Sequence, residues 1–223
     1  MVKQVARRLG APSGPRAANV AETRERILQA AIRQFARHGF AGARIDVICA
    51  EAGVNARMIY HYYSDKAGLY VAVLERVLGD LRIEELKLEI DESRPLDGLL
   101  TMFEFTFRHF ARHPELVRLL SAENLLEGQY LKGSESTPMV ASPVIGHIGT
   151  LLARGEATGA LRPGLDPVHL YVTMVALCYF HKSNAYTLSA IFRTDIGAED
   201  WQQQHFAMAR AVLAAYLAPP AQH

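Results

Sequence analysis

Apolar residues recur every three or four positions along this chain from residue 22 to residue 217, and this spacing constrains the fold more than any other feature. Such a spacing places the apolar side chains on one face of an α-helix. No segment shows the strict alternation of apolar and polar residues that a half-buried strand has. We therefore expect an all-α fold in which each helix buries one apolar stripe.

Start and stop signals divide this pattern into separate helices. A first helix is predicted from Glu22 to Gly39, because glycine readily adopts the positive φ of a helix stop. Two short helices and a long one should follow, over about 45–52, 56–62 and 66–90. Further helices are expected after Pro95, from Pro114, and over about 139–156, 167–189 and 198–217, with a loop over 128–138.

Charge is unevenly divided along the chain. Residues 1–66 carry 11 Lys/Arg and 5 Asp/Glu, a net charge of +6, whereas residues 67–223 carry 13 and 18, a net charge of −5. A basic end on an acidic body favours contact between that end and a polyanion, although such an asymmetry also arises by chance. Residues 1–20 contain Lys3, Arg7, Arg8 and Arg16 and no acid, which predicts a disordered basic arm. Such an arm is either a solvated tail or a segment that enters a minor groove.

Residues 45–62 have the features of two short helices that cross steeply through a tight turn. Gly53 suits the positive φ of the turn, Cys49 is small enough for close approach, and Asn55 can cap the second helix. The apolar residues on the shared side are Ile48, Ala52, Val54, Ile59 and Tyr62. This pattern predicts a helix-turn-helix, and a purely structural corner of an enzyme remains the alternative.

In a DNA-binding helix-turn-helix, the first residues of the second helix contact base edges in the major groove. Arg57 suits guanine, and Asn55 suits adenine or a phosphate. Ala56 and Met58 suit thymine methyl groups. The residues expected to lie along the phosphate backbone are Arg44, Tyr60, His61 and Lys66.

The stretch from Arg44 to Asn55, followed by Ile59-Tyr60-His61-Tyr62-Tyr63-Ser64-Asp65-Lys66, resembles the signature of the TetR family. The resemblance covers residues 22–76. It implies a repressor that dimerises through its last two helices and releases DNA when a small molecule enters the body. It also implies phosphate contacts by Tyr60, His61, Lys66 and Arg44. The chain departs from the family pattern at Arg44, Asn55 and Ala56-Arg57, where Thr, Ser/Thr and Lys-Gly are common, so a different operator preference is expected.

Residues 166–171 and 183–192 are similar to the RutR-like subgroup of that family, which leaves the ligand unspecified. We accordingly expect three parts: a basic arm (1–20), a helix-turn-helix DNA-binding domain (21–66), and a helical effector-binding and dimerisation domain (67–223). The expected partners are a near-palindromic double-stranded DNA operator, a small-molecule effector and a second copy of the chain. An all-α enzyme or ligand carrier is the alternative from another class, and an activator is the alternative within the family.

Two sets of residues in the body are candidates for these roles. Aromatic walls with a few polar groups are typical of ligand pockets, although the same residues also suit an ordinary core. The pocket candidates are Phe103, Phe107, Glu123, Asn124, Tyr171, Met174 and Cys178. The last helix suits either the core or a dimer interface. Its interface candidates are Trp201, His205, Val212, Leu213 and Tyr216.

The sequence has only weak signals for a metal site, an enzyme active site or a membrane segment. His109 and His113 have the spacing of two metal ligands, with Glu115 nearby, but the sequence offers no evident third ligand, so we expect no metal and no cofactor. No nucleophile–base pair of an enzyme is evident. Cys49 and Cys178 have the apolar surroundings of buried free thiols. The longest apolar run is Met174–Phe180, far shorter than a membrane span, and no leader peptide is recognisable, which predicts a cytoplasmic protein.

Overall fold

The computed structural model describes residues 15–134 and 143–219, which form α-helices and one 3-10 turn, with no strand in these two ranges. The elements are α2 (Pro15–Gly42), α3 (Ile45–Ala52), α4 (Ala56–Tyr63), α5 (Lys66–Glu85), α6 (Pro95–Arg112), α7 (Pro114–Leu125), η1 (Leu131–Gly133), α8 (Pro143–Thr158), α9 (Pro167–Ser183), α10 (Ala185–Phe192) and α11 (Glu199–Leu217). The all-α prediction is therefore confirmed.

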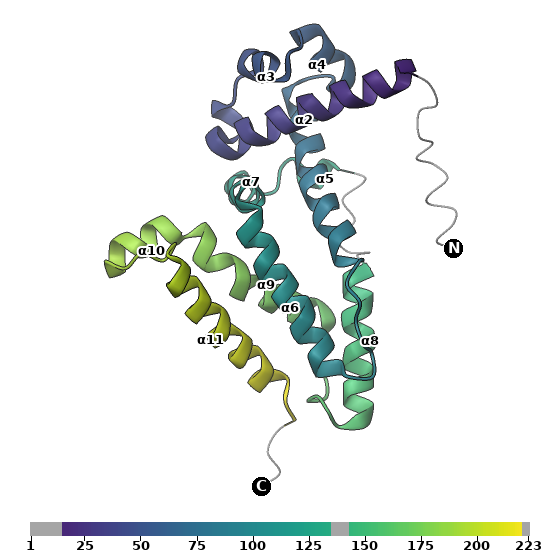
Figure 1. Ribbon diagram of the computed structural model, residues 1–223, viewed down its shortest axis with the longest axis vertical. Helices are drawn as coiled ribbons and strands as arrows, with labels where there is room; N and C mark the ends of the chain where they lie inside the picture. The colour runs from purple at the N-terminus through teal and green to yellow at the C-terminus, as the bar shows by residue number, and fades with distance from the viewer. Residues whose placement is uncertain (1–14, 135–142, 220–223) are drawn as a thin grey trace.

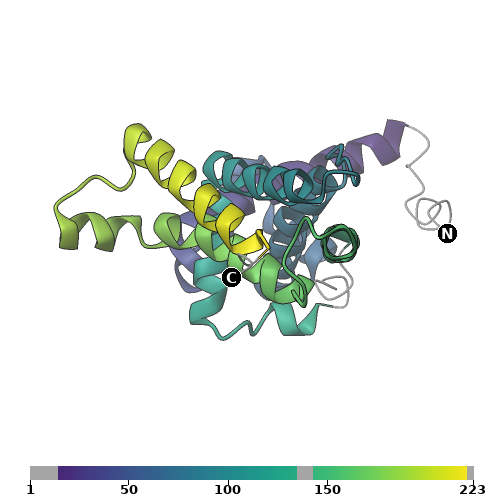
Figure 2. The same ribbon diagram turned by 90° about the horizontal axis from the view of Figure 1, so that it is seen from below.

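The helices form a head and a body that α5 connects (Figure 1). The head contains α2, α3 and α4 at the upper end of the view. The lower part contains α6, α8, α9 and α11, and α7 lies beneath the head. Seen from below, α10 and α11 extend to one side of the molecule (Figure 2). Because α5 begins beside α4 and ends inside the body, it is the mechanical link between the two parts.

The first helix begins earlier than the sequence pattern predicts. α2 starts at Pro15, so residues 15–20, which we expected in the disordered arm, are helical. Proline suits the first position of a helix, and the Ala-rich residues after it have high helix propensity. Residues 1–14 of the expected arm lie outside the described residues. Gly39 has φ 65° and ψ −179°, which interrupts α2 where the helix stop was predicted.

The connecting helix ends earlier than predicted. α5 stops at Glu85 and not near residue 90. The chain then turns, and Leu88 and Ile90 pack back against the core. The absence of a side chain at Gly98 makes room for this return, because a Cβ there would lie 2.9 Å from a methyl group of Ile90.

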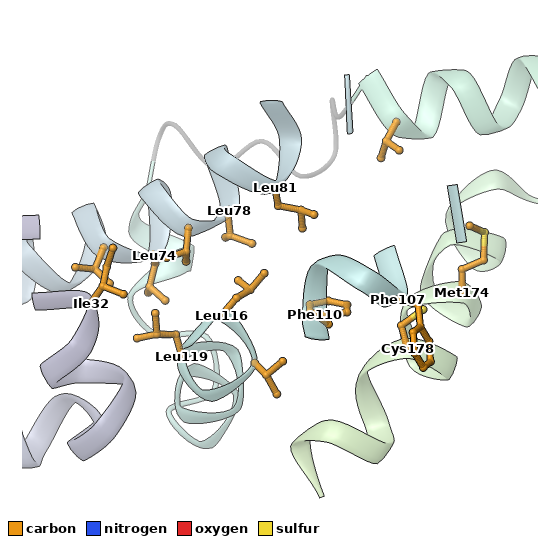
Figure 3. Packing of buried hydrophobic residues seen from close by; sticks show 14 of the residues in the cluster. Ile32, Leu74, Leu78, Leu81, Phe107, Phe110, Leu116, Leu119, Met174 and Cys178 are labelled. Atoms are coloured by element: carbon orange, nitrogen blue, oxygen red, sulfur yellow. The ribbon is translucent and has the colours of Figure 1, made fainter. Parts of the chain in front are cut away.

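A continuous core joins the head to the body. One face of α5 is buried along its whole length, from Leu69 to Leu81. Figure 3 shows how Leu74 and Leu78 of α5 face Leu116 and Leu119 of α7, with Ile32 of α2 beside them. Movement of α5 therefore displaces side chains of both α2 and α7.

The apolar helix predicted over 167–189 is two helices. It breaks at Asn184 between α9 and α10, and the Asn184 side chain donates to the Phe180 carbonyl at 3.0 Å. The almost wholly apolar sequence of this segment predicts burial on most sides, but the single chain buries only one stripe of α9: Leu170, Met174, Cys178 and His181. The apolar residues Val168, Val172 and Phe180 on this helix are exposed.

The helix expected over 139–156 is described from Pro143 to Thr158, and residues 139–142 lie outside the described residues. Among the helices of the described part, none combines the length and apolar character that crossing a bilayer requires.

Candidate functional site

The corner between α3 and α4 has the backbone that the sequence predicts. Gly53 adopts the left-handed conformation (φ 64°, ψ 41°), which costs a residue without a Cβ little. Its N–H donates to the Ala50 carbonyl at 3.3 Å, and the Val54 N–H donates to the Cys49 carbonyl at 3.0 Å. The Asn55 side chain accepts a hydrogen bond from the Met58 N–H at 3.2 Å and so caps α4. These bonds fix the direction in which α4 leaves the turn.

The two short helices share a buried side. Ile48, Cys49 and Ala52 of α3 and Ile59 and Tyr63 of α4 are buried. Tyr63 and not Tyr62 is the buried aromatic residue, because Tyr63 follows Ile59 by one helical turn. The Tyr63 hydroxyl donates to the Arg24 carbonyl of α2 at 3.2 Å.

Polar contacts attach the corner to α2. Arg33 of α2 donates to the carboxylate of Glu51 on α3 at 3.1 and 3.2 Å, and Gln34 donates to the other oxygen of that carboxylate. With Tyr63 docked on the same helix, α2 holds both α3, through Glu51, and α4, through Tyr63. These contacts fix how the outer face of α4 is presented.

The outer face of α4 brings together most of the residues expected to contact DNA. Asn55, Ala56, Arg57 and His61 are exposed, and Met58 is half-buried. The Tyr60 side chain is also exposed, although it is a large apolar group. Among the described residues, no side chain pairs with the Arg57 guanidinium. This face therefore offers a free cation, an aromatic hydroxyl and an imidazole to a partner outside the subunit.

The other two expected contacts flank this helix and have partners of their own. Arg44, just before α3, is exposed and forms an ion pair with Asp46, with Nε 3.0 Å from Oδ1. Lys66, at the start of α5, donates to the Ala41 carbonyl at 3.4 Å, and its ammonium lies 5.0 Å from the centre of the Phe40 ring. Lys66 thus joins α5 to the end of α2.

Gly68 is a residue of this region that sequence reasoning missed. A Cβ at Gly68 would lie 2.1 Å from the Tyr63 carbonyl oxygen. The chain turns from α4 into α5 at Ser64, which has φ 65°, and the Asp65 side chain caps α5 by accepting from the Gly68 N–H at 2.7 Å. The sequence does contain a signal for this close approach, because Gly68 follows Asp65, the residue that caps α5, by three positions.

The body contains a mainly apolar cleft of about 370 Å³ that includes one of the expected pocket residues. It is lined by Leu78, Leu81, Arg82, Phe110, Leu120, Gly128, Leu131, Lys132, Tyr171 and Val175. Arg82 pairs with Glu85, and its guanidinium lies 5.2 Å from the centre of the Tyr171 ring. Burial raises the pKa of the Glu85 carboxyl, and the attraction of Arg82 opposes that shift. Arg82 and Lys132 were not anticipated.

The remaining expected pocket residues lie elsewhere. Phe103 and Phe107 pack against Phe206, and Phe107 also lines another cleft, of about 700 Å³, beside α7 and α9. Met174 and Cys178 are in the closed core. Glu123 is buried and accepts from the backbone N–H groups of Tyr130 and Leu131 at 2.7 and 3.0 Å, and Asn124 is exposed. Helix periodicity indicates which side chains face the interior of the body. It does not show whether such a side chain fills the core or lines a cavity.

The expected interface residues of α11 divide between two environments. Trp201 and His205 stack on each other and contact His181, and Leu213 is in the core. Val212 and Tyr216 are exposed, at 52% and 45% of their surfaces. The exposed apolar side chains of α9, α10 and α11 are Val168, Val172, Phe180, Tyr186, Ile191, Phe192, Met208, Val212 and Tyr216.

Two protein-family models match the chain. One, described as "Bacterial regulatory proteins, tetR family", matches residues 27–73, and the other, described as "Tetracyclin repressor-like, C-terminal domain", matches residues 95–212. The first match includes the corner and the outer face of α4. The second includes the helices that carry the exposed apolar residues.

Curated relatives support the same grouping. The chain is 34% identical over 193 residues to the HTH-type transcriptional repressor NicS of Pseudomonas putida, covering 85% of this chain and 91% of that protein. It is 30% identical over 158 residues to the HTH-type transcriptional regulator RutR of Escherichia coli, covering 71% and 73% of the two chains.

Solved structures have the same fold. The crystal structure of SCO4942 from Streptomyces coelicolor has a TM-score of 0.66 and 27% identity, covering 89% of this chain and 99% of that one. A TetR family transcription regulator from Marinobacter aquaeolei has a TM-score of 0.56 and 22% identity, covering 86% and 95%, and at this identity it supports the fold alone.

Proposed function

The chain belongs to the TetR family of bacterial DNA-binding transcriptional regulators, and on that premise we propose that it is a homodimeric repressor that releases its operator when a small molecule occupies the body. The observation that carries this proposal is the outer face of α4. Arg57 lies there, exposed and without a partner among the described residues, on a corner that is bonded to α2. An unpaired cation on a helix that is attached to the rest of a basic domain suits contact with nucleic acid.

We assign base contact to the first turn of α4. Arg57 donates two hydrogen bonds to guanine, and Ala56 and Met58 contact thymine methyl groups. The Asn55 Oδ1 already accepts from the Met58 N–H, so its amide Nδ2 is the group left to donate to a phosphate or to an adenine acceptor. Base contact depends on Arg57 more than on Asn55.

Phosphate contact is assigned to the residues around this helix. The hydroxyl of Tyr60 and the imidazole of His61 are exposed next to Arg57, and Arg44 and Lys66 flank them. Phosphate contacts position a protein on DNA without distinguishing sequences. Lys66 contributes in a second way, because its bond to the Ala41 carbonyl keeps α5 against the head.

A near-palindromic operator requires two copies of α4 about 34–36 Å apart, one helical turn of DNA. The surface we assign to the dimer interface is the exposed apolar part of α9, α10 and α11. On α11 the exposed residues Met208, Val212 and Tyr216 are four positions apart and form one stripe, next to the buried Ala209 and Leu213. A second copy of the chain would cover this stripe of α11 and the exposed apolar residues of α9, which are Val168, Val172 and Phe180.

The effector site we propose is the cleft beside Tyr171. Its apolar lining with two cations suits a small, largely apolar molecule that carries a hydrogen-bond acceptor or a negative charge. Leu78, Leu81 and Arg82 of α5 form one wall, so a ligand that favours another position of α5 also changes the separation of the two heads. Ligand binding can weaken DNA binding only by the difference in ligand affinity between the two positions of α5. Such a coupling free energy is typically ~1–3 kcal/mol.

A repressor of this kind acts in the cytoplasm, where the buried free thiols Cys49 and Cys178 would stay reduced.

The test of the proposal is a gel shift with the DNA upstream of its own gene. The proposal requires a salt-sensitive band that prefers this DNA to random duplex and that weakens when a metabolite binds. A ligand carrier or enzyme with a structural corner would give no such band, and an activator would bind outside the promoter elements that a repressor covers.

A further inference from the structure

We propose that Glu84, His109 and His113 form a binding site for a divalent transition metal ion of the zinc type, which would join α5 to the end of α6. The two histidines have the spacing of metal ligands in the sequence, and the fold brings Glu84, 25 residues before His109, next to them. This site is independent of the proposed DNA binding.

The three side chains converge closely enough to share one ion. One ligand atom from each lies within 4.8 Å of the others. The His109 Nδ1 and the Glu84 Oε2 are 3.1 Å apart. Two ligand atoms bound tetrahedrally to zinc, each at about 2.0–2.1 Å from it, lie roughly 3.3 Å from each other. Two of the three ligand atoms are thus already near the separation of a coordinated pair, and the His113 ligand atom, which lies within 4.8 Å of the other two, would move toward them on binding.

The two histidines lie against each other at the junction of α6 with α7. His109 is buried. The two rings stack with centres 4.3 Å apart. The Nδ1 of His113 is 3.0 Å from a carboxylate oxygen of Glu115. A carboxylate that accepts from one ring nitrogen orients the other toward a metal, which is the usual outer support of a ligating histidine.

A cation can reach this site from solvent. The three residues line a cleft of about 500 Å³ between α2, α5 and the junction of α6 with α7. Three carboxylates line it, those of Asp80, Glu84 and Glu115, against the cations Arg33 and Lys87. Arg33 is already paired with Glu51 and Asp80 with Arg76, which leaves the carboxylates of Glu84 and Glu115 against the ammonium of Lys87, so the lining favours a positive ion. Two nitrogens and one carboxylate are ligands typical of zinc, cobalt or nickel, whereas calcium and magnesium prefer oxygen alone. The fourth position is available to water.

The simpler explanation is a structural hydrogen bond between His109 and Glu84, with His113 as a neighbour that plays no part. The two explanations differ in what they require of His113, because only metal binding depends on it. Glu84 and His113 are both partly exposed, so replacing them is compatible with folding, whereas replacing the buried His109 endangers the fold.

The experiment uses the full chain without a purification tag, stripped with a chelator, and titrated with Co²⁺ as a visible spectroscopic probe and then with Zn²⁺. We expect one Co²⁺ per chain with the intense visible absorption of four-coordinate cobalt, displacement by Zn²⁺, and a rise in Tm as metal is added. The variants Glu84→Gln and His113→Ala should each weaken binding by at least about 10-fold. The matched control is His169→Ala, which removes an exposed histidine of α9 and should bind as the wild type does.

Circular dichroism of each variant before titration verifies that it is folded. Absence of a saturable cobalt spectrum in the wild type would overturn the proposal. Equal affinity in the wild type and His113→Ala would also overturn it, since the metal would then be held elsewhere on the chain.

Discussion

Gly68 lies directly against the carbonyl oxygen of Tyr63, so close that a Cβ at Gly68 would be 2.1 Å from that oxygen. The contact allows α5 to begin within three residues of the end of α4. It therefore connects the helix that carries Arg57 to the helix that enters the body. Any side chain at this position must displace one of the two helices.

The first prediction is that Gly68→Ala destabilises the protein by about 1–3 kcal/mol, because the new methyl group meets backbone that cannot yield without moving a helix. The matched control is Gly79→Ala on the same helix, where a Cβ meets nothing within 4 Å. That change should stabilise by roughly 0.5–1 kcal/mol, because alanine has the higher helix propensity. Urea unfolding measures both, and the same sign for the two variants would contradict the packing argument.

The second prediction concerns acid stability. Arg76 of α5 donates to Glu25 of α2 at 2.6 and 3.0 Å, and these bonds hold the pKa of Glu25 below its usual value of 4.5. A lowered folded-state pKa contributes stability above the usual value, and that stability is lost as the pH falls through the lowered one. Glu25→Gln should therefore lower Tm at pH 7 and reduce the fall of Tm toward pH 3.

The control for this prediction is Glu22→Gln, which changes an exposed glutamate of the same helix. Its Tm should follow the wild-type pH curve. Thermal melts from pH 3 to pH 7 provide the comparison, and parallel curves for Glu25→Gln and the wild type would show that the α2–α5 ion pair does not contribute.

A third prediction separates the roles of two cations. Arg57→Ala should cost about 1–3 kcal/mol on the operator and little on random DNA, because it removes a base contact. Lys66→Ala should weaken both DNAs alike and reduce the salt slope by about one, because it removes a phosphate contact. Fluorescence anisotropy at several salt concentrations measures both effects. Equal losses on the two DNAs from Arg57→Ala would contradict the assigned base contact. The matched control is Arg108→Ala, which removes a cation from α6 in the body and should leave binding to both DNAs unchanged.

The fourth prediction is that Val212→Arg yields monomers and abolishes operator binding. Val212 lies in the exposed apolar stripe of α11, and a two-fold interface would bring two added charges into an apolar surface. The control, Leu86→Arg, changes another exposed apolar residue just after α5 and should remain dimeric. Sedimentation velocity measures the mass, and a dimeric Val212→Arg protein would place the interface elsewhere.

The corner of the head could be predicted from sequence because its determinants are local. Gly53 and Asn55 act on their nearest neighbours, and α3 occupies residues 45–52 as expected. Tyr63 was missed in favour of Tyr62 because the two are adjacent and both aromatic, and only the end of α4 decides which faces α2.

Features that depend on distant segments could not be predicted. After α5 ends at Glu85, the connecting segment folds back so that Ile90 packs beside Gly98 of α6, a contact that helix periodicity does not show. Likewise, Glu84 and His109 are 25 residues apart, so periodicity cannot show that they meet. The almost wholly apolar sequence of α9 predicts burial on most sides, and this is wrong for the single chain, which leaves Val172 and Phe180 exposed. A sequence pattern does not specify whether a partner is another helix or another subunit.

A hydroxyl-radical footprint of the protein on the DNA upstream of its own gene shows whether a dimer binds through the outer face of α4. We expect two protected segments related by approximate two-fold symmetry, with centres about one helical turn or a small multiple apart, as two copies of α4 require. Both should weaken together in Arg57→Ala at a concentration that just saturates the wild type. A single protected segment, or an unchanged footprint with Arg57→Ala, would contradict the claim that a dimer binds DNA through the outer face of α4.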